Sequence, residues 1–305
     1  MPEVLAVRNA RTAGILAPAH GLIRSVRRTE WVVAVFLVYA AAAACVLPVP
    51  AQIRLVTMAA NVAILFGYMA LIYADFTCAG ALGVVRDWAP LALILLAYRE
   101  MGWFALPQYD HVLEAHWVVW DRVVLRGGAK ALIEAFGPVL PSVLEIAYSL
   151  VYVLGPFSVA MLYIYGRRDC VDRFLFVFSA GVLLCYAQLP LWPSEPPRVL
   201  FFGNDFPAYD TIFRRFNWWM LDRCGIHTGV FPSAHVAGAF AAAFGIRRVM
   251  PERRWVVRLL FTMAVLIAVA TVYGRYHYLV DATGGFLMAA FASQIAGRLR
   301  TQPRD

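Results

Sequence analysis

Long apolar runs recur along the chain and predict a series of membrane-spanning helices. Each run holds roughly 18 or more mainly apolar residues, the helix length needed to cross about 30 Å of hydrocarbon. Arg99 and Glu100 interrupt the third run, which is the least regular of the series. We expect about eight spans, at 31–47, 54–74, 88–106, 142–165, 172–191, 233–250, 255–274 and 279–297.

Arginines gather in alternate connections between these runs, and this bias orients the chain. Cytoplasmic loops carry an excess of Lys and Arg, so the pattern predicts that both termini are cytoplasmic. Two larger loops, 107–140 and 192–232, then lie on the extracytoplasmic or lumenal face. The inner segments hold Arg8, Arg11, Arg24, Arg27, Arg28, Arg86, Arg167, Arg168, Arg173, Arg247, Arg248, Arg253, Arg254, Arg258, Arg298, Arg300 and Arg304.

Within the first of these loops, apolar positions recur at near-helical spacing. Val112, Leu113, Trp117 and Trp120 follow this spacing beside charged residues. The pattern predicts a helix that lies in the interface, with its tryptophans at head-group depth.

Composition supports an all-α, polytopic transmembrane bundle. Of 305 residues, 62% are hydrophobic and 15% charged, and the mean hydropathy is +0.66. A soluble domain of this size could not bury so much apolar surface. The net charge of +8 is explained by cytoplasmic loops against an anionic leaflet and requires no nucleic acid. Five cysteines at no metal-like spacing predict neither a zinc site nor a disulfide framework.

Charged residues inside the expected spans need partners, because a charge at membrane depth is costly unless it is paired or functional. Arg99 and Glu100 lie in the third expected span and Glu145 in the fourth. We expect Arg99 to pair with Glu145 in a structural role.

Three polar stretches reach the outer surface in this topology, and the last joins the seventh and eighth spans. It reads GRYHYLVD, with His277 four residues before Asp281. On a helix start this spacing places both on one face, where the carboxylate can fix the tautomer of the imidazole. An oriented nucleophile or base results. A structural alternative is that Asp281 caps the helix beside an interfacial histidine.

The other two stretches add groups suited to an oxyanion. In GVFPSAHVAG, Ser233 is a good N-cap and His235 falls in the first helical turn, where free N–H groups favour a phosphate. In PSEPPR, Arg198 follows a rigid turn and could grip two phosphate oxygens. Arg275 lies near His277. Taken singly, these residues also suit helix capping or head-group contact. Together they predict a phosphate site that requires no metal or other cofactor.

These motifs resemble the type 2 phosphatidic acid phosphatase superfamily. PSAH (232–235) resembles its Pro-Ser-Gly-His motif, and HYLVD (277–281) resembles the end of its third motif. Ala270 and Thr271 stand where that pattern has Ser-Arg, and Leu191 stands where it has lysine. These departures are more similar to the inositol phosphorylceramide synthase branch, as is RDWAPLALILLAYRE (86–100).

The resemblance implies a six-helix phosphatase-type core within 86–305, preceded in 1–85 by a cytoplasmic tail and two accessory spans. It implies that His277 attacks phosphorus to form a phosphohistidine, that Asp281 orients it and that His235 is the general acid and base. Arg198 and Arg275, helped by Ser233, would hold the phosphoryl oxygens.

The implied substrate is a membrane phospholipid or sphingolipid, and the implied acceptor is an alcohol, such as inositol or another lipid. Hydrolysis of a phosphatidate, sphingoid or polyprenyl phosphate, with water as acceptor, would use the same residues. A lipid-binding scaffold or transporter is a third reading, which the intact motifs disfavour. Tyr186 and Gln188 precede Arg198 near the membrane edge and could line the pocket.

Overall fold

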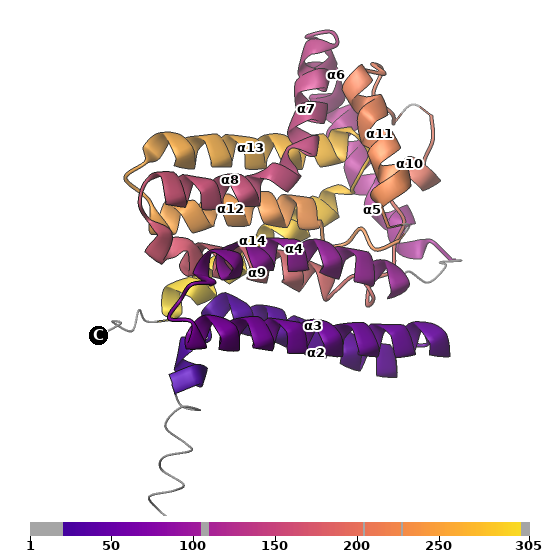
Figure 1. The fold of residues 1–305 in the computed structure, drawn as a ribbon. Coiled ribbons are helices and arrows are strands. Elements are labelled where there is room, and N and C mark those ends of the chain that lie inside the picture. The colour runs from indigo at the N-terminus through magenta and orange to yellow at the C-terminus, as the bar shows by residue number, and fades with distance from the viewer. Residues whose placement is uncertain (1–20, 105–109, 204, 227, 300–305) are drawn as a thin grey trace, which may run out of the picture.

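In the computed structural model the apolar runs form helices that lie side by side in one bundle (Figure 1). The structure describes residues 21–104, 110–203, 205–226 and 228–299, so most of the N-terminal segment that precedes the first helix and the last residues lie outside it. Every regular element in these ranges is a helix. The bundle helices are α2 (Arg28–Val46), α3 (Ala51–Thr77), α4 (Gly83–Met101), α8 (Val151–Ile164), α9 (Val171–Tyr186), α12 (Ala234–Val249), α13 (Arg254–Tyr273) and α14 (Leu279–Arg298).

Four of these helices are long and apolar enough to cross a membrane by themselves: α2, α3, α13 and α14. The chain is therefore a membrane protein. The helices α9 and α12 have 16 residues each, about 24 Å at 1.5 Å per residue, which is shorter than a typical hydrocarbon core. Length and composition thus support fewer independent spans than the eight apolar runs predict.

The expected span at 142–165 is not one helix. It breaks at Leu150 into α7 (Val139–Ser149) and α8, and α7 runs across the direction of the bundle (Figure 1). The sequence is apolar on both sides of the break, so hydropathy does not reveal it. The cause of the break lies in α7. Its buried Glu145 forms an ion pair at 3.1 Å with Arg214, a residue that does not belong to the bundle helices.

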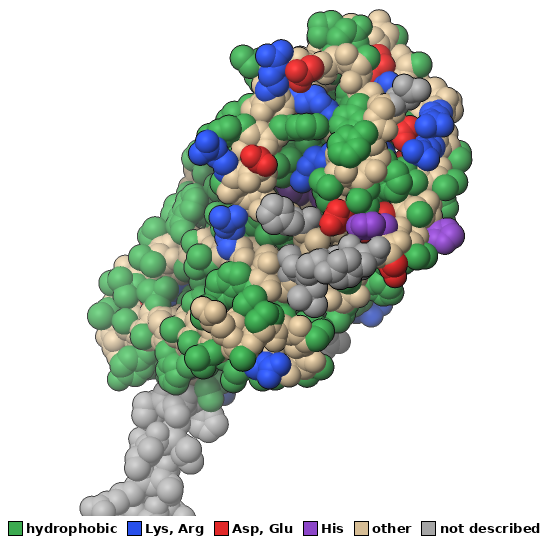
Figure 2. Space-filling view, turned by 90° about the vertical axis from the view of Figure 1, so that its right-hand side faces the viewer, with side chains coloured by type: hydrophobic (Ala, Val, Ile, Leu, Met, Phe, Trp, Pro, Cys, Tyr) green, Lys and Arg blue, Asp and Glu red, His purple; other side chains and the backbone are tan. Residues whose placement is uncertain are grey.

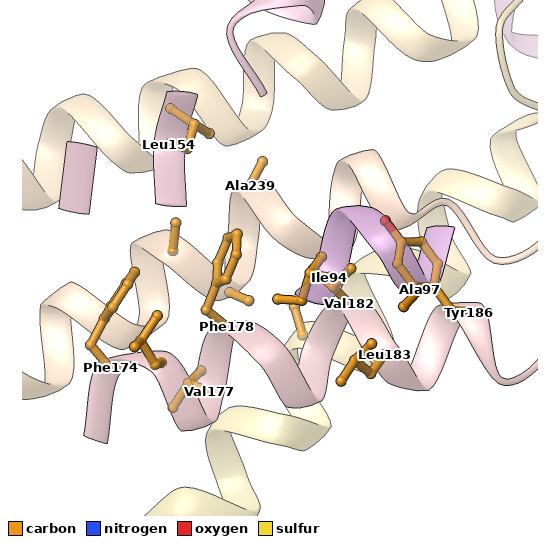
Figure 3. Close-up of a cluster of buried hydrophobic side chains, with 14 of the residues drawn as sticks. Ile94, Ala97, Leu154, Phe174, Val177, Phe178, Val182, Leu183, Tyr186 and Ala239 are labelled. Carbon is orange, nitrogen blue, oxygen red and sulfur yellow. The ribbon is translucent and has the colours of Figure 1, made fainter. Parts of the chain in front are cut away.

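The centre of the bundle is the pair α9 and α12. α12 is rich in alanine and glycine, so α9 packs closely against it. A Cβ atom added at Gly181 would lie 3.0 Å from Ala241 Cβ, and one at Gly245 would lie 2.8 Å from the Phe174 ring. Side chains of α9, including Phe178, fill the space toward α4, α8 and α12 (Figure 3).

The first two helices are attached by a buried charge network at one end of the bundle. Arg86 of α4 contacts Glu30 of α2 at 2.7 Å and Asp75 of α3 at 2.8 Å. Arg27 contacts Asp87 at 2.6 Å. Since Arg86, Glu30 and Asp75 are buried, three helices share one compensated cluster of charges.

Shorter elements cover the opposite end, where Lys, Arg, Asp and Glu side chains are interspersed among hydrophobic ones (Figure 2). The helix expected around Trp117 and Trp120 is present as α5, whose Glu114 and Asp121 are buried; its place in the membrane interface stays a prediction. The segments Val112–Glu134 and Val139–Ser149 meet at 108°. The elements at this end are α5 (Val112–Val124), the π-helical turn Leu125–Ala129, α6 (Lys130–Glu134), α7, α10 (Pro197–Leu200) and α11 (Ile212–Cys224); η1 (Gly102–Phe104) follows α4, and η3 (Arg168–Cys170) precedes α9 at the other end.

Candidate active site

A small cavity lies beneath the covering elements, where the three polar stretches converge. Its volume is about 40 Å³, more than one water requires. Arg198, His235 and His277 all line it. The complete lining is Tyr98, Tyr148, Tyr186, Leu189, Arg198, Leu221, Ile226, Gly229, Val230, Pro232, Ala234, His235, Tyr276 and His277.

His277 lies in the connection between α13 and α14, and one of its ring nitrogens is fully engaged. Nδ1 is 3.0 Å from the Val230 carbonyl oxygen and 3.3 Å from Asp281 Oδ2. Both neighbours are acceptors, so Nδ1 carries the proton and Nε2 is left with its lone pair. Asp281 is itself held in place, since its Oδ2 accepts a hydrogen bond from the Tyr278 backbone N–H at 2.8 Å.

The surroundings of His277 keep its imidazole neutral. Burial lowers its pKa from 6.5 to about 3, and the positive charge of Arg198 acts in the same direction. Desolvation and a nearby cation both disfavour the imidazolium. Near neutral pH, His277 therefore presents an unprotonated nitrogen, which is the form required of a nucleophile.

His235 approaches the same space from the start of α12. Ser233 caps this helix, accepting a hydrogen bond from the Val236 N–H at 3.4 Å. The His235 ring stacks on Tyr148 with 4.9 Å between centroids, and its Nε2 is 3.4 Å from the Tyr152 hydroxyl. Its centroid is 5.5 Å from that of His277. Two imidazoles, each fixed by contacts with neighbouring residues, thus border one cavity.

Arg198 brings the positive charge to this cavity from the short helix α10. Its backbone N–H donates to the Arg275 carbonyl oxygen at 3.0 Å, and its Nη1 lies 3.5 Å from the Tyr276 carbonyl oxygen. These contacts tie α10 to the connection that holds His277. They leave the guanidinium with donors for an oxyanion beside both histidines.

Of the other expected site residues, one lines the cavity and the rest lie outside its lining. Tyr186 lines the cavity. Gln188 donates to the Leu184 carbonyl oxygen at 2.9 Å and is not part of the lining. Ser233 is fully buried as the helix cap. Arg275 is completely buried, pairs with Asp121 at 2.6 Å and does not line the cavity. Its Nε and Nη2 have no hydrogen-bond partner among the described residues, and its expected contact with phosphate stays a prediction.

Two acidic residues support the connection that carries His277, and the sequence does not single them out for the site. Asp121 of α5 accepts hydrogen bonds from Arg275 Nη1 at 2.6 Å and from the Leu279 backbone N–H at 2.7 Å. A buried acid on an amphipathic helix was the available signal, but its partner is 154 residues away.

Glu145 is the second support, and the expected Arg99–Glu145 pair is wrong. Glu145 binds Arg214 at 3.1 Å, Asn217 at 2.7 Å and the Tyr276 hydroxyl at 2.6 Å. Arg99 instead donates to the Cys224 carbonyl oxygen at 2.6 Å. The two charges lie in different surroundings because α7 leaves the bundle before α8 begins.

Across the described ranges, no three His, Cys, Asp or Glu side chains are grouped to hold a metal ion.

Comparisons with known proteins add to this description of the site. A PA-phosphatase related-family protein of Dictyostelium discoideum is 30% identical over 117 residues, covering 36% of this chain and 19% of that protein. The chain thus matches only a small part of that relative's length. No solved structure matches.

The family model of the PAP2 superfamily matches residues 129–295. This range is more than half of the 305-residue chain, and it contains every lining residue of the cavity except Tyr98. The chain belongs to the PAP2 superfamily.

Proposed function

We propose that the protein is a lipid phosphotransferase that acts through a phosphohistidine at His277. PAP2 superfamily members are phosphatases or phosphotransferases. One observation carries the proposal: the ring centroids of His235 and His277 are 5.5 Å apart, at a cavity that Arg198 also lines. Phosphoryl transfer needs a positioned nucleophile, an acid and base, and fixed positive charge, all of which this cavity supplies.

In the first step, His277 Nε2 attacks the phosphorus of a lipid phosphate ester. A bond from phosphorus to nitrogen forms as the ester bond to the leaving alkoxide breaks. His235 takes up a proton when the anionic substrate binds and gives it to that alkoxide, and Arg198 binds the phosphoryl oxygens. Asp281 accepts from Nδ1, so its carboxylate offsets the positive charge that develops on the ring.

In the second step His235, which is neutral after giving its proton to the leaving alkoxide, takes a proton from an alcohol. The alcohol oxygen then attacks phosphorus, the bond to His277 breaks, and the ring returns to its neutral form. The phosphoryl or phospho-head group is thereby moved from lipid to alcohol, with inositol or another lipid as the acceptor we propose. Proton and phosphoryl group are both conserved over the cycle.

Aromatic lining supports an alcohol acceptor. Tyr98, Tyr148, Tyr186 and Tyr276 all border the cavity, and a tyrosine offers an apolar face with a polar hydroxyl. A polyol ring has the complementary character, since it combines C–H faces with hydroxyl groups. Leu191, Ala270 and Thr271 depart from the phosphatase pattern, and these departures also favour an alcohol acceptor, as in the inositol phosphorylceramide synthase branch.

Hydrolysis is the second candidate, with water in place of the alcohol. The name of the Dictyostelium relative, a PA-phosphatase related-family protein, favours it. The same catalytic residues would serve, and the tyrosine wall would then contact the lipid head group.

The proposed placement in the membrane follows the arginine distribution. We propose that both termini are cytoplasmic and that the cavity opens on the extracytoplasmic or lumenal face. Residues 86–305 would form the catalytic core, and the accessory helices α2 and α3 would belong to 1–85.

Product analysis tests the proposal. Purified protein is incubated with labelled lipid phosphate esters, with and without inositol or a lipid alcohol. A new phospholipid that requires the alcohol is expected, whereas free phosphate with every acceptor would establish the phosphatase.

A substitution tests the role of His277. His277→Ala is expected to lower turnover by at least about 10³-fold and to abolish a ³²P-labelled, acid-labile protein adduct. The matched control is His116→Ala, because His116 is an exposed histidine of α5. Near wild-type turnover in well-folded His277→Ala would overturn the mechanism.

A further inference from the structure

A second and larger cavity lies at the end of the bundle opposite the candidate active site. Its volume is about 240 Å³. It is formed where α2 and α9 begin and where α12 and α14 end, at the left of Figure 1. Its lining is Arg28, Arg173, Phe176, Arg248, Val249, Ala296, Gly297 and Leu299.

The two cavities are separated by the full length of the bundle. His277 precedes the first residue of α14, whereas Gly297 and Leu299 lie at its other end. A helix of 20 residues is about 30 Å long. The second cavity is therefore too far from His235 and His277 to share their ligand.

The lining combines positive charge with apolar surface. Three arginines border the cavity, and among the described residues that line it none is acidic. Phe176, Val249, Ala296 and Leu299 supply the apolar part. Charge and apolar surface occur together in this way where a head group meets its acyl chains, at the ends of membrane helices.

The existing contacts of Arg173 and Arg248 leave them able to bind an anion. Arg248 Nη2 donates to the Ser293 carbonyl oxygen at 2.5 Å, and a Cβ atom at Gly297 would lie 3.0 Å from Nη1. Thus Gly297 leaves room for this guanidinium. Arg173 Nη2 donates to Cys170 Sγ at 2.9 Å. Arg173 also lies 3.8 Å from Asp169, whose side chain is 69% exposed, and such an exposed pair is weak.

We propose that this cavity binds the phosphate of an anionic phospholipid from the leaflet opposite the active site. Arg173 and Arg248 hold the phosphate oxygens, and the apolar side chains contact the first methylene groups of the lipid. A soluble phosphate ester shares the head-group chemistry and differs in lacking those methylene contacts. The site binds its ligand without transforming it, since no nucleophilic or acid–base side chain lines it.

Binding to purified full-length protein in detergent tests this proposal. The probes are phosphatidylglycerol, phosphatidylcholine and glycerol 3-phosphate, and the readout is an apparent Kd from native mass spectrometry or thermal shift. We expect phosphatidylglycerol to bind more tightly than phosphatidylcholine. Arg173→Ala/Arg248→Ala is expected to weaken it about tenfold or more, because two charge-assisted contacts are lost.

Controls separate this site from the rest of the molecule. Arg254→Ala removes an exposed arginine at the same end that does not line the cavity, so it should leave the Kd unchanged. Phosphatidylglycerol is also a lipid phosphate ester, so binding is measured in Arg198→Ala protein as well; there the active site contributes less, and Arg173→Ala/Arg248→Ala should still weaken binding about tenfold or more. Arg173→Lys/Arg248→Lys keeps the charge and should retain part of the affinity, which distinguishes lost binding from lost folding.

The source of the phosphate follows from competition. If glycerol 3-phosphate displaces phosphatidylglycerol at comparable concentration, the site recognises phosphate esters without need of the chains; if it does not, the lipid is the ligand. An unchanged Kd in Arg173→Ala/Arg248→Ala, or an equal loss in Arg254→Ala, would overturn the proposal.

Discussion

At the scale of single residues, His277 is a neutral imidazole, and its proposed role as nucleophile has a consequence for pH dependence. Burial and the charge of Arg198 lower its pKa from 6.5 to about 3. The attacking form is unprotonated, so with this pKa it makes up about nine-tenths of the protein at pH 4 and nearly all of it above pH 5. For a phosphodiester donor, which does not titrate in this range, kcat/KM should not fall between pH 7 and pH 5.

Arg198→Gln provides the comparison for that profile. Removing the cation removes one of the two effects that lower the pKa of His277, so the pKa rises toward 6.5 and the acid-side loss of kcat/KM moves to higher pH. The magnitude of kcat/KM should fall as well, because Arg198 is also the proposed ligand of the phosphoryl group. An acid limb centred near pH 6.5 in the wild-type protein would contradict the assignment of His277 as the neutral nucleophile.

The site residues that can be predicted from the sequence are those that lie close to one another along the chain. His277 and Asp281 are one helical turn apart, and Ser233 and His235 begin a helix, so both pairs can be recognised in the sequence. Arg275 is different, because its role depends on a distant partner. Two residues from His277, it resembles a phosphate ligand, yet its partner is Asp121, a contact that local spacing does not encode.

At the scale of elements, α14 and α12 touch at the point that sets the distance between the two histidines. A Cβ atom at Gly285 would lie 2.2 Å from the Ser233 carbonyl oxygen and 3.1 Å from the Ala237 nitrogen. Because both atoms are backbone, Gly285→Ala must move the start of α12. His235 would shift against His277, and misplacement of about 1 Å can cost about 10²-fold in rate.

Measured kcat, with a melting curve for each protein, tests this prediction. Gly67→Ala on α3 is the matched control, since no heavy atom lies within 4 Å of its added Cβ. Gly285→Ala should lose rate, and Gly67→Ala should not. Equal kcat in the two variants would show that the contact between α12 and α14 does not position His235.

The covering helix α5 is coupled to the same connection through the pair Asp121–Arg275. Both side chains are fully buried, so removing one partner leaves an uncompensated charge, at a cost of about 3–5 kcal/mol. Asp121→Asn should lower the melting temperature and kcat together. In a double-mutant cycle, adding Arg275→Met should recover part of the stability; strictly additive losses would argue against a coupled pair.

At the scale of the whole molecule, hydropathy predicts an all-helical membrane bundle but not where its helices bend. The apolar run 142–165 looks continuous, yet it divides at Leu150 because Glu145 of α7 is bound by Arg214 and Asn217 of α11. A hydropathy pattern reports how apolar a segment is and carries no information on such distant polar partners. For the same reason it could not locate the partner of Arg99.

The buried charge network of α2, α3 and α4 should affect stability more than chemistry. Arg86 is 4% exposed and compensates Glu30 and Asp75, so Arg86→Met leaves two buried carboxylates without their cation. That loss costs about 3–5 kcal/mol, equivalent to a fall in melting temperature of roughly 10 °C. The site is formed mainly by elements from α7 to α14, so kcat per folded molecule should stay within about twofold.

Melting curves and kcat measured on the same preparations separate these effects. Arg258→Met is the matched control, because Arg258 is an exposed arginine of α13, and it should change neither quantity. An unchanged melting temperature in Arg86→Met would show that the network does not hold the accessory helices. A tenfold loss of kcat in folded Arg86→Met would instead mean that α2 and α3 help to shape the active site through α4 and its Tyr98.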